Sequence, residues 1–265
     1  MTLERKIRHI EDLRGFRIVR HLGQGGMGSV FKAVYPNGCH VAVKIFHPEV
    51  ISSLDRNENI FSDWHKAARV QHPNLCRLLE LYSDQEIVFL IMEYIQGKSL
   101  RSIVKSRSHC PVENGLELSI STMCGVSALH KVKLIHGDVR PVNICVVDNS
   151  SVKLIDYGVS YPKALCQADM ESTNRTYTGY MPPEIWQGNK PNLLSDVYSL
   201  GVLTYHLLTG EKPRKRPDQK EVKPLRFFQK SVRVDVEELV LKALSLEPEI
   251  RPKSAMEMLS GLGQN

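Results

Sequence analysis

One short segment, residues 136–143, constrains this 265-residue chain more than any other feature. It reads His-Gly-Asp-Val-Arg-Pro-Val-Asn, so Asp138, Arg140 and Asn143 stand close together, and Asp156 follows thirteen residues after Asn143. One carboxylate can orient an attacking hydroxyl, the amide and the other carboxylate can hold a metal, and the cation can stabilise charge on a transferred group. The spacing therefore favours transfer of a phosphoryl group from a magnesium-bound nucleotide to a hydroxyl. The alternative, a simple polar turn, is weakened because Asn143 and Asp156 follow at useful spacing.

The hydrophobic pattern changes near Gln96-Gly97, which predicts two lobes joined by a hinge. Before the hinge, a helical pattern at 54–70 interrupts apolar runs that predict five strands, at 16–22, 29–35, 41–46, 75–82 and 87–93. Beyond it, helical periodicity dominates, and a short strand pair is expected around 144–146 and 152–154; the helices are predicted at 116–130, 193–208, 234–244 and 254–261. We therefore expect an α+β fold with an N-terminal extension (1–15), a small sheet lobe (16–94) and a larger, mainly helical lobe (95–265).

Composition excludes several classes of protein. The net charge of +6 suits nucleotide phosphates or an acidic partner but falls short of the basic face of a nucleic-acid binder. The six cysteines are scattered, with no two closer than fourteen residues, so no metal-ligand pair is indicated. The polar, basic start lacks the apolar run of a signal peptide, and no segment approaches the length of a membrane span. We therefore expect a cytoplasmic protein that does not insert into a membrane.

Residues 23–28 form a G-x-G-x-x-G motif between two predicted strands. Glycines let backbone amides come close to phosphate oxygens, because they carry no Cβ. A dinucleotide-binding fold would place this motif between a strand and a helix, so the strand-to-strand position indicates a phosphate-covering hairpin instead. Taken alone, the motif is equally consistent with an ordinary glycine-rich hairpin.

Lys44 ends the apolar segment Val-Ala-Val-Lys at 41–44. On a strand its side chain shares a face with that of Ala42. A lysine on the inward face is costly unless it is paired, so we expect a triphosphate and an acidic residue on a helix as its partners. The alternative is a lysine at a strand end that points into water.

In sum, nearly the whole chain, 16–262, resembles a eukaryotic-like Ser/Thr protein kinase domain of the bacterial type. The motifs that carry the resemblance lie in the family's order, at 23–28, 41–44, 92–95, 136–143, 156–158, 181–184, 195–201 and 251–252. The resemblance implies a two-lobed fold with a five-stranded antiparallel N-lobe sheet. It also implies ATP and Mg²⁺ as cofactors and protein substrates, the chain itself among them.

The resemblance also implies a role for each motif residue. Asp138 would be the catalytic base, Asn143 and Asp156 the magnesium ligands, and Lys44 the contact to the α- and β-phosphates. Arg140 stands where most relatives have a lysine near the γ-phosphate. The implied nucleotide site comprises Leu22, Gly23, Gln24, Gly25, Gly26, Met27, Gly28, Val30, Ala42, Lys44, Met92, Glu93, Ile95 and Cys145. Arg251 would pair with Glu184, and the 195–201 helix, with Asp196, would anchor the catalytic loop.

The sequence departs from the family pattern at the helix acid that should pair with Lys44. Counting nine residues back from His72 gives Asp63, which is one methylene shorter than the usual glutamate. Either the helix lies closer to the sheet, or Glu58 serves through a shift of register. A weaker pair would lower activity or make it depend on a partner. Asp63 could instead be a solvated helix residue.

Two further departures concern the substrate side. Gly137 replaces the arginine that senses a loop phosphate in the family, so we expect no requirement for phosphorylation at Ser172, Thr173, Thr176 or Thr178. Tyr177 stands where the family has a threonine, which leaves the preference for Ser/Thr over Tyr open.

Other interpretations stay open on the sequence. One is a pseudokinase that binds a nucleotide or a partner without turnover. Another is a small-molecule phosphotransferase of the aminoglycoside or choline kinase kind, which also carries H-G-D-x-x-x-x-N. The basic run at 212–217 is either a solvated loop or a docking site for acidic substrates or anionic lipid. A homodimer is possible.

Overall fold

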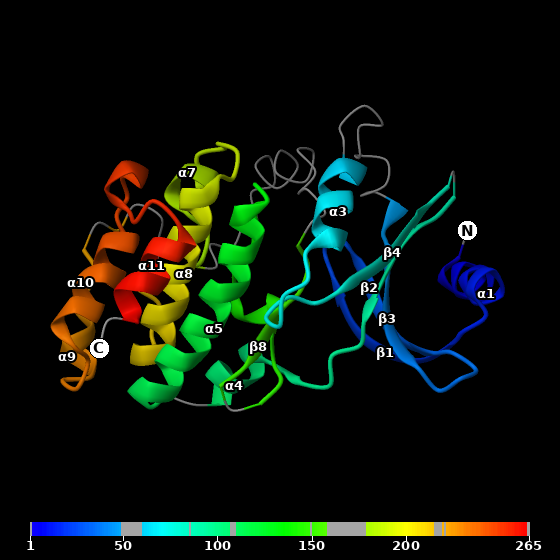
Figure 1. Cartoon of the computed structure of the whole chain (residues 1–265), viewed down its shortest axis with the longest axis horizontal. Helices are drawn as coiled ribbons and strands as arrows, with labels where there is room; N and C mark the ends of the chain where they lie inside the picture. Colours follow the sequence, from blue (N-terminus) through cyan, green and yellow to red (C-terminus); the bar gives the residue numbers. More distant parts are fainter. Residues whose placement is uncertain are drawn as a thin grey trace.

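The computed structural model describes residues 2–48, 60–84, 86–106, 110–148, 150–157, 179–214, 219 and 221–263. A sheet lobe and a helical lobe lie side by side along the long axis of the molecule (Figure 1). Both lobes, and the sheet order described next, confirm the predicted α+β architecture.

The N-lobe sheet has the order β1-β2-β3-β5-β4, and every neighbouring pair is antiparallel. Its strands are β1 (Arg17–Gly25), β2 (Gly28–Val34), β3 (His40–Phe46), β4 (Leu78–Ser83) and β5 (Val88–Glu93). Helix α3 (Ile60–Arg69) packs beside β4. All five predicted strands are present, and α3 covers the described part of the helix expected at 54–70.

Alternation along β3 gives the sheet two different faces. Val41, Val43 and Ile45 join an apolar cluster on the outer face, whereas Ala42 and Phe46 join the large core that continues into the C-lobe. Lys44 shares the face of Ala42 and Phe46, as strand geometry requires. It is therefore directed toward the junction of the two lobes, although its side chain is charged.

An N-terminal helix, α1 (Leu3–Arg14), covers the outer face of the sheet (Figure 1). The sequence analysis assigned no structure to this extension. Ile10 is fully buried in the outer cluster, and Arg14 forms two hydrogen bonds to the carboxylate of Glu80 while its guanidinium lies over the Tyr82 ring. Gly15 ends the helix in the left-handed conformation (φ 66°), which glycine adopts without strain. The extension is thus part of the N-lobe.

The C-lobe is built around two long helices, α5 (Val112–Lys131) and α8 (Leu193–Thr209), which pack against each other. The remaining helical segments are α4 (Leu100–Ser106), η1 (Pro141–Asn143), α7 (Pro183–Trp186), α9 (Leu225–Phe228), α10 (Val234–Ala243), η2 (Pro248–Ile250) and α11 (Ala255–Leu262). Fourteen of the seventeen residues of α8 are buried, which explains its nearly continuous apolar sequence. The four predicted C-lobe helices are all present.

A second, three-stranded sheet links the lobes. It consists of β6 (Lys98–Ser99), β7 (Ile144–Val146) and β8 (Val152–Leu154). Leu154 also bridges to Leu75 of the N-lobe, and its carbonyl accepts the amide of Cys76 at 2.8 Å. The segment that ends in Asp156 is therefore tied to both lobes.

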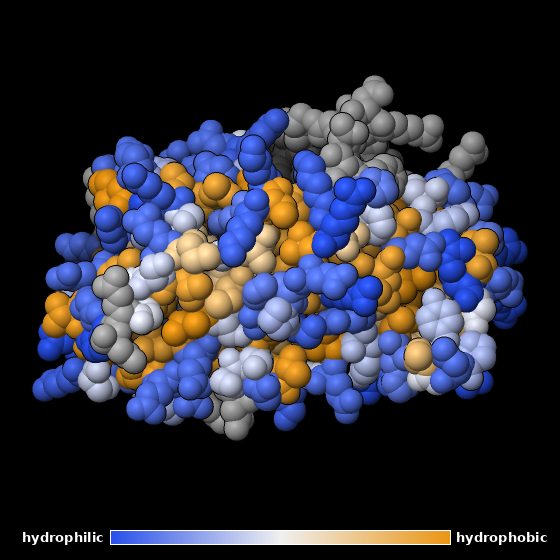
Figure 2. Space-filling view, in the orientation of Figure 1, coloured by the Kyte–Doolittle hydropathy of each residue, from blue (hydrophilic) through white to orange (hydrophobic). Residues whose placement is uncertain are grey.

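Hydrophilic side chains dominate the face shown in Figure 2, with apolar groups scattered between them over both lobes. Within the described residues, none of the helices combines the length and the apolar character that crossing a bilayer requires.

Candidate active site

The segment 136–143 is held in place by Asp196, a fully buried carboxylate on α8. Its two oxygens accept the backbone amides of His136 and Gly137, both at 2.8 Å, and His130 lies 2.9 Å from the same carboxylate. Gly137 has φ 76°, where a side chain would be strained. The expected anchoring of this segment by Asp196 is confirmed.

Asp138, Arg140 and Asn143 form one polar cluster on this segment. The Asn143 side-chain amide donates to the Asp138 carbonyl at 2.9 Å and to its carboxylate at 2.7 Å. Arg140 Nε lies 3.0 Å from the same carboxylate. Because the amide nitrogen of Asn143 is engaged twice, its amide oxygen is the group left to face a ligand.

Asp156 lies next to this cluster, because the amide of Ile155 donates to the carbonyl of Asn143 at 3.0 Å. Asp156 itself has φ 61°, a conformation that a residue other than glycine rarely adopts. Such strain concentrates at functional sites, where the surrounding structure imposes it. The backbone thus places the second carboxylate beside Asn143 at a conformational cost.

Lys44 reaches this carboxylate from the other lobe. Its Nζ lies 2.8 Å from Asp156 Oδ1, and the lysine is only 4% exposed. Lys44 is therefore buried and paired, but its partner in this structure is Asp156 rather than an acid on a helix, and its contact to a triphosphate stays a prediction. Side-chain contacts thus join Asn143 to Asp138 and Lys44 to Asp156, and the backbone hydrogen bond from Ile155 to Asn143 links the two pairs.

The acid expected on α3 has a different contact. Asp63 lies 3.3 Å from Lys66, one turn along the same helix. The pairing of Lys44 with Asp63 stays a prediction, and the alternative partner Glu58 lies outside the described residues.

The glycine motif forms the predicted hairpin between β1 and β2, in which Gly25 pairs with Gly28. A Cβ at Gly28 would lie 2.2 Å from the carbonyl oxygen of Ile45, so β3 approaches too closely for any side chain there. Ala42 and Met92 are direct neighbours across β3 and β5 and are both buried. These residues place the expected nucleotide contacts of the N-lobe around one strand, β3.

The remaining expected nucleotide contacts border the hinge. Glu93 ends β5, and its amide donates to the Arg77 carbonyl at 2.9 Å. Cys145 lies on β7, where burial raises the pKa of its thiol to about 11, with the nearby Asp156 adding to the shift. Cys145 therefore acts as a neutral, mainly apolar surface rather than as a nucleophile.

Two contacts near this site were not expected from the sequence. The Tyr157 hydroxyl donates to the Cys76 carbonyl, and the Tyr157 ring is almost fully buried. Lys153 Nζ lies 2.5 Å from the carboxylate of Glu93, which joins β8 to the hinge. The tyrosine at a position that is phenylalanine in D-F-G was the available sign of the first contact. Nothing in the sequence pairs Lys153 with Glu93.

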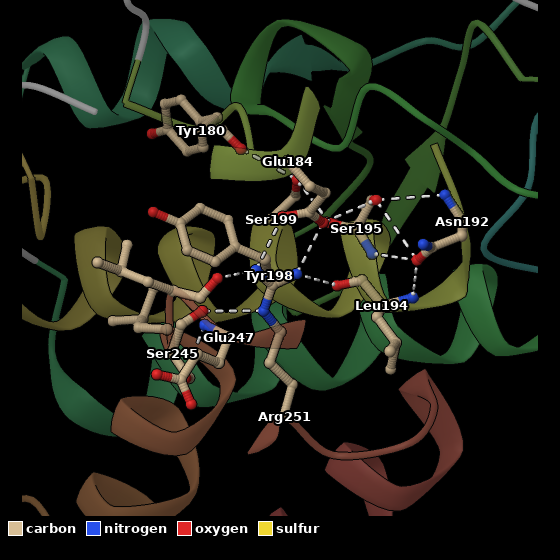
Figure 3. A network of polar contacts seen from close by, with 12 residues as sticks. Tyr180, Glu184, Asn192, Leu194, Ser195, Tyr198, Ser199, Ser245, Glu247 and Arg251 are labelled. Atoms are coloured by element: carbon tan, nitrogen blue, oxygen red, sulfur yellow. Dashed lines mark hydrogen bonds and ion pairs between the residues drawn. The ribbon is translucent and has the colours of Figure 1, made fainter. Parts of the chain in front are cut away.

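A buried ion pair joins Glu184 and Arg251 in the C-lobe. Arg251 donates to both oxygens of Glu184, at 2.8 and 2.9 Å, and Ser195 donates to the same carboxylate at 2.9 Å (Figure 3). Arg251 also bonds the carbonyls of Leu194 and Ser245. Burial alone would raise the pKa of Glu184, but the hydrogen bonds and charge of Arg251 outweigh it and lower that pKa. The predicted Glu184–Arg251 pair is confirmed.

Several predicted features lie outside the described residues: Gly158, Ser172, Thr173, Thr176, Tyr177, Thr178 and the 215–217 part of the basic run.

The fold, the glycine hairpin and the ordered polar series define a protein kinase domain. The chain belongs to this family, whose model, described as the protein kinase domain, matches residues 16–261.

Curated proteins similar to this chain are named serine/threonine-protein kinases. The chain is 28% identical over 264 residues to a probable serine/threonine-protein kinase of Clostridium perfringens, an alignment that covers 93% of this chain and 38% of that protein. It is 29% identical over 263 residues to the serine/threonine-protein kinase PknB of Mycobacterium leprae, covering 91% of this chain and 41% of PknB. The chain thus spans well under half the length of these relatives.

Solved structures show the same fold. A mutant of the Mycobacterium tuberculosis PknI kinase domain aligns with a TM-score of 0.74 at 21% identity, covering 94% of both chains. A Rad53 fragment crystallised with AMP-PNP aligns with a TM-score of 0.73 at 22% identity, covering 94% of this chain and 65% of that one. Both establish the two-lobed architecture.

Proposed function

We propose that this chain is an active protein kinase that transfers the γ-phosphoryl group of ATP to serine or threonine hydroxyls of proteins, itself included. The observation that carries the proposal is the connected series Asp138–Asn143–Asp156–Lys44, which spans both lobes. Each member has the chemistry that phosphoryl transfer needs at that point.

Asp138 orients the substrate hydroxyl and accepts its proton. Its carboxylate is held by Asn143 and Arg140, so it can present an oxygen in a fixed direction. Arg140 contacts Asp138 in this structure. When ATP binds, a change of rotamer would move its guanidinium from Asp138 to the γ-phosphate. Its planar guanidinium can bind phosphate oxygens in a bidentate manner, and it remains charged at every relevant pH.

Lys44 binds the α- and β-phosphates of ATP in this proposal. Its side chain is buried, and the only charge that it contacts within hydrogen-bond distance among the described residues is that of Asp156. A phosphate oxygen is a second acceptor that would replace the water from which the ammonium is shielded. Leu22, Val30, Ala42, Met92, Ile95 and Cys145 would then enclose the base and sugar of the nucleotide.

The donor set fits Mg²⁺. The free amide oxygen of Asn143 and a carboxylate oxygen of Asp156 are hard oxygen ligands, and Mg²⁺ is commonly held by one or two protein oxygens together with phosphates and waters. When bound, the ion would neutralise phosphate charge. The protein's part would be to hold these two oxygens near each other, and the backbone hydrogen bond from Ile155 to Asn143 supports this because it joins the two segments that carry them.

The preference for serine and threonine follows the relatives, which are named serine/threonine-protein kinases. The confirmed Glu184–Arg251 pair and the Asp196 anchor also favour the protein kinase branch over small-molecule phosphotransferases, which generally lack both motifs. We further propose a cytoplasmic location and protein substrates whose identity the chain does not reveal.

The proposal is tested with purified protein, labelled ATP and Mg²⁺, with and without generic protein substrates. Asp138→Asn should reduce transfer by about 10²–10⁴-fold, because the base that orients the hydroxyl is lost. Asp235→Asn, an exposed aspartate on α10, is the matched control and should keep full activity. Nucleotide binding without transfer in the parent protein would indicate a pseudokinase, and labelling of small alcohols alone would indicate a small-molecule enzyme.

A further inference from the structure

The aromatic ring of Tyr94 connects the chain between the lobes to the N-lobe sheet. Tyr94 directly follows β5, in the segment 94–97 that leads to β6 and the C-lobe. Lys32 Nζ lies 4.4 Å from the centre of the Tyr94 ring. The ring of His40 meets this ring edge-on with 6.0 Å between the ring centres, and Arg20 Nη2 donates to the Tyr94 hydroxyl at 3.5 Å. Basic side chains from β1, β2 and β3 therefore converge on one ring.

Two of these side chains share a row of the sheet with residues of the proposed nucleotide site. Arg20 of β1 lies opposite Lys32 of β2, which lies opposite Ala42 of β3. Ala42 in turn lies opposite Met92 of β5. Residues directly opposite each other in an antiparallel pair are on the same face of the sheet. Tyr94 is thus held by the same face that Ala42 and Met92 present to the nucleotide.

The other end of the segment 94–97 is fixed to the C-lobe. The strand that follows it, β6, pairs with β7. A Cβ at Gly97 would lie 2.4 Å from the Val146 carbonyl oxygen, so the backbone of the segment lies directly against β7. β7 also carries Cys145, the C-lobe residue of the proposed nucleotide site. The segment is therefore tied to one lobe at Gly97 and to the other at Tyr94.

Contacts at both ends restrict how the two halves of the nucleotide site can move apart. A site that is ordered before its ligand arrives binds more tightly, because less conformational entropy is lost on binding. The contact between Lys32 and Tyr94 can supply this order, since a cation over an aromatic face is attracted to it. Both residues are partly buried, so water screens the attraction less than at a fully exposed site.

We propose that Tyr94 is a positioning residue for the nucleotide: its contacts with three basic side chains of the sheet hold the segment 94–97 in place, so that the nucleotide site is formed before ATP binds. This inference rests on the proposed kinase function and deepens it. Tyr94 acts through its two neighbours in the chain, Glu93 and Ile95, which belong to the proposed nucleotide site. Its loss should therefore weaken ATP binding and have little effect on the transfer step.

The test measures the Kd of AMP-PNP in the presence of Mg²⁺ by isothermal titration calorimetry. Tyr94→Leu removes the ring and should weaken binding about three- to tenfold, as expected for the loss of one partly buried cation–π contact. Lys32→Met removes the charge but keeps the length of the side chain, and should cause a similar loss. The double variant should bind about as weakly as Tyr94→Leu, because the two residues act through one contact. Tyr94→Phe keeps the ring under the ammonium and should retain most of the affinity.

Phe227→Leu is the matched control. Lys223 Nζ lies 4.8 Å from the centre of the Phe227 ring, on α9 at the end of the C-lobe far from the sheet (Figure 1). This variant loses a contact of the same kind and should leave the Kd unchanged. Without nucleotide, the melting temperature of Tyr94→Leu should fall no further than that of the control. In steady-state kinetics, Tyr94→Leu should raise the KM for ATP with little change in kcat.

The outcomes separate this inference from the proposed function. An unchanged Kd in Tyr94→Leu, or losses that add up in the double variant, would contradict the positioning role even if the enzyme is active. The expected pattern of Kd values in a protein that transfers no phosphoryl group would support the positioning role, and only the proposed function would fail. A parent protein that does not bind AMP-PNP would overturn both.

Discussion

Two ion pairs in the described part of the chain, Glu184–Arg251 and Lys44–Asp156, are built very differently. Glu184–Arg251 in the C-lobe is bidentate, and the arginine also bonds the Leu194 and Ser245 carbonyls. Lys44–Asp156, which joins the two lobes, has one close contact, and the aspartate side chain is 27% exposed against 9% for Glu184. The first pair is complete within the protein, whereas the second leaves oxygens and an ammonium for something else to bind.

Backbone conformation sharpens this contrast. Asp156 adopts φ 61°, whereas Glu184 lies on the short helix α7 with ordinary geometry. Of the two pairs, the incompletely satisfied one thus carries the strained backbone. A pair whose purpose is stability has no need of strain, so the difference separates a structural pair from one arranged for a ligand.

The largest expected effect on stability comes from breaking the structural pair. Arg251→Ala should lower the free energy of unfolding by about 3–5 kcal/mol, because it leaves the buried Glu184 carboxylate without its partner. Lys44→Met should cost much less stability, because Asp156 is partly exposed and can be hydrated. Chemical denaturation of the two variants beside the parent measures both values.

Phosphoryl transfer by the folded variants should follow the opposite order from stability, with the larger loss at the Lys44–Asp156 pair. Lys44→Met should abolish most transfer while the domain stays folded, and Arg251→Lys, which keeps the charge but not the fork, should retain more activity than Lys44→Met. A Lys44→Met variant as unstable as Arg251→Ala would remove the distinction between the two pairs.

Acidification should act on the C-lobe through His206, which lies beside the same anchor. Its Nδ1 accepts the Tyr180 hydroxyl, and burial, aided by the charge of Lys212, lowers the pKa of His206 to about 4. The unfolded chain, with the usual histidine pKa near 6.5, binds this proton more readily. The contribution of His206 to stability is therefore fully present above pH 6.5 and is lost progressively as the pH falls toward 4.

Thermal unfolding measured between pH 7 and pH 4 checks this prediction. His206→Gln keeps a side-chain acceptor for Tyr180 but cannot be protonated, so its melting temperature should fall less over that range than the parent's. Identical pH profiles for the parent and the variant would contradict the role of His206. The exposed His9→Gln is the control, because its side chain is 44% exposed.

The contrast between the two ion pairs also explains which features could be predicted from the sequence. The five strands and the long helices follow from local periodicity, whereas the Glu184–Arg251 pair follows from the resemblance to the kinase family. The burial of Lys44 was predicted, because alternation fixes its face of β3. Its partner in this structure was not, because the choice between acids depends on how far α3 lies from the sheet.

Other features could not be predicted from the sequence, because they depend on contacts between residues that are far apart in the chain. Helix α1 carries few apolar residues, and Ile10 is informative only once the outer face of the sheet is known to need a cover. Sequence periodicity specifies which face of an element is buried, but not which distant charge it will contact.

The smallest expected effect on stability comes from substituting Tyr157, the residue after Asp156. Its hydroxyl donates to the Cys76 carbonyl, and burial is the main cause of its raised pKa, so it stays protonated and able to donate. Tyr157→Phe keeps the ring but leaves the buried carbonyl unpaired, and should lower the free energy of unfolding by about 1 kcal/mol.

Because Tyr157 follows Asp156 directly, the same substitution should also loosen the strained aspartate. We expect the KM for ATP to rise by a few fold with little change in kcat, since the transferring groups remain in place. Steady-state kinetics at several ATP concentrations distinguish the two parameters. Tyr205→Phe is the matched control, because Tyr205 likewise donates its hydroxyl to a backbone carbonyl, that of Lys223, but lies in the C-lobe away from the cleft. If both variants lose similar stability and only Tyr157→Phe alters the KM, the geometry of the Lys44–Asp156 pair depends on Tyr157.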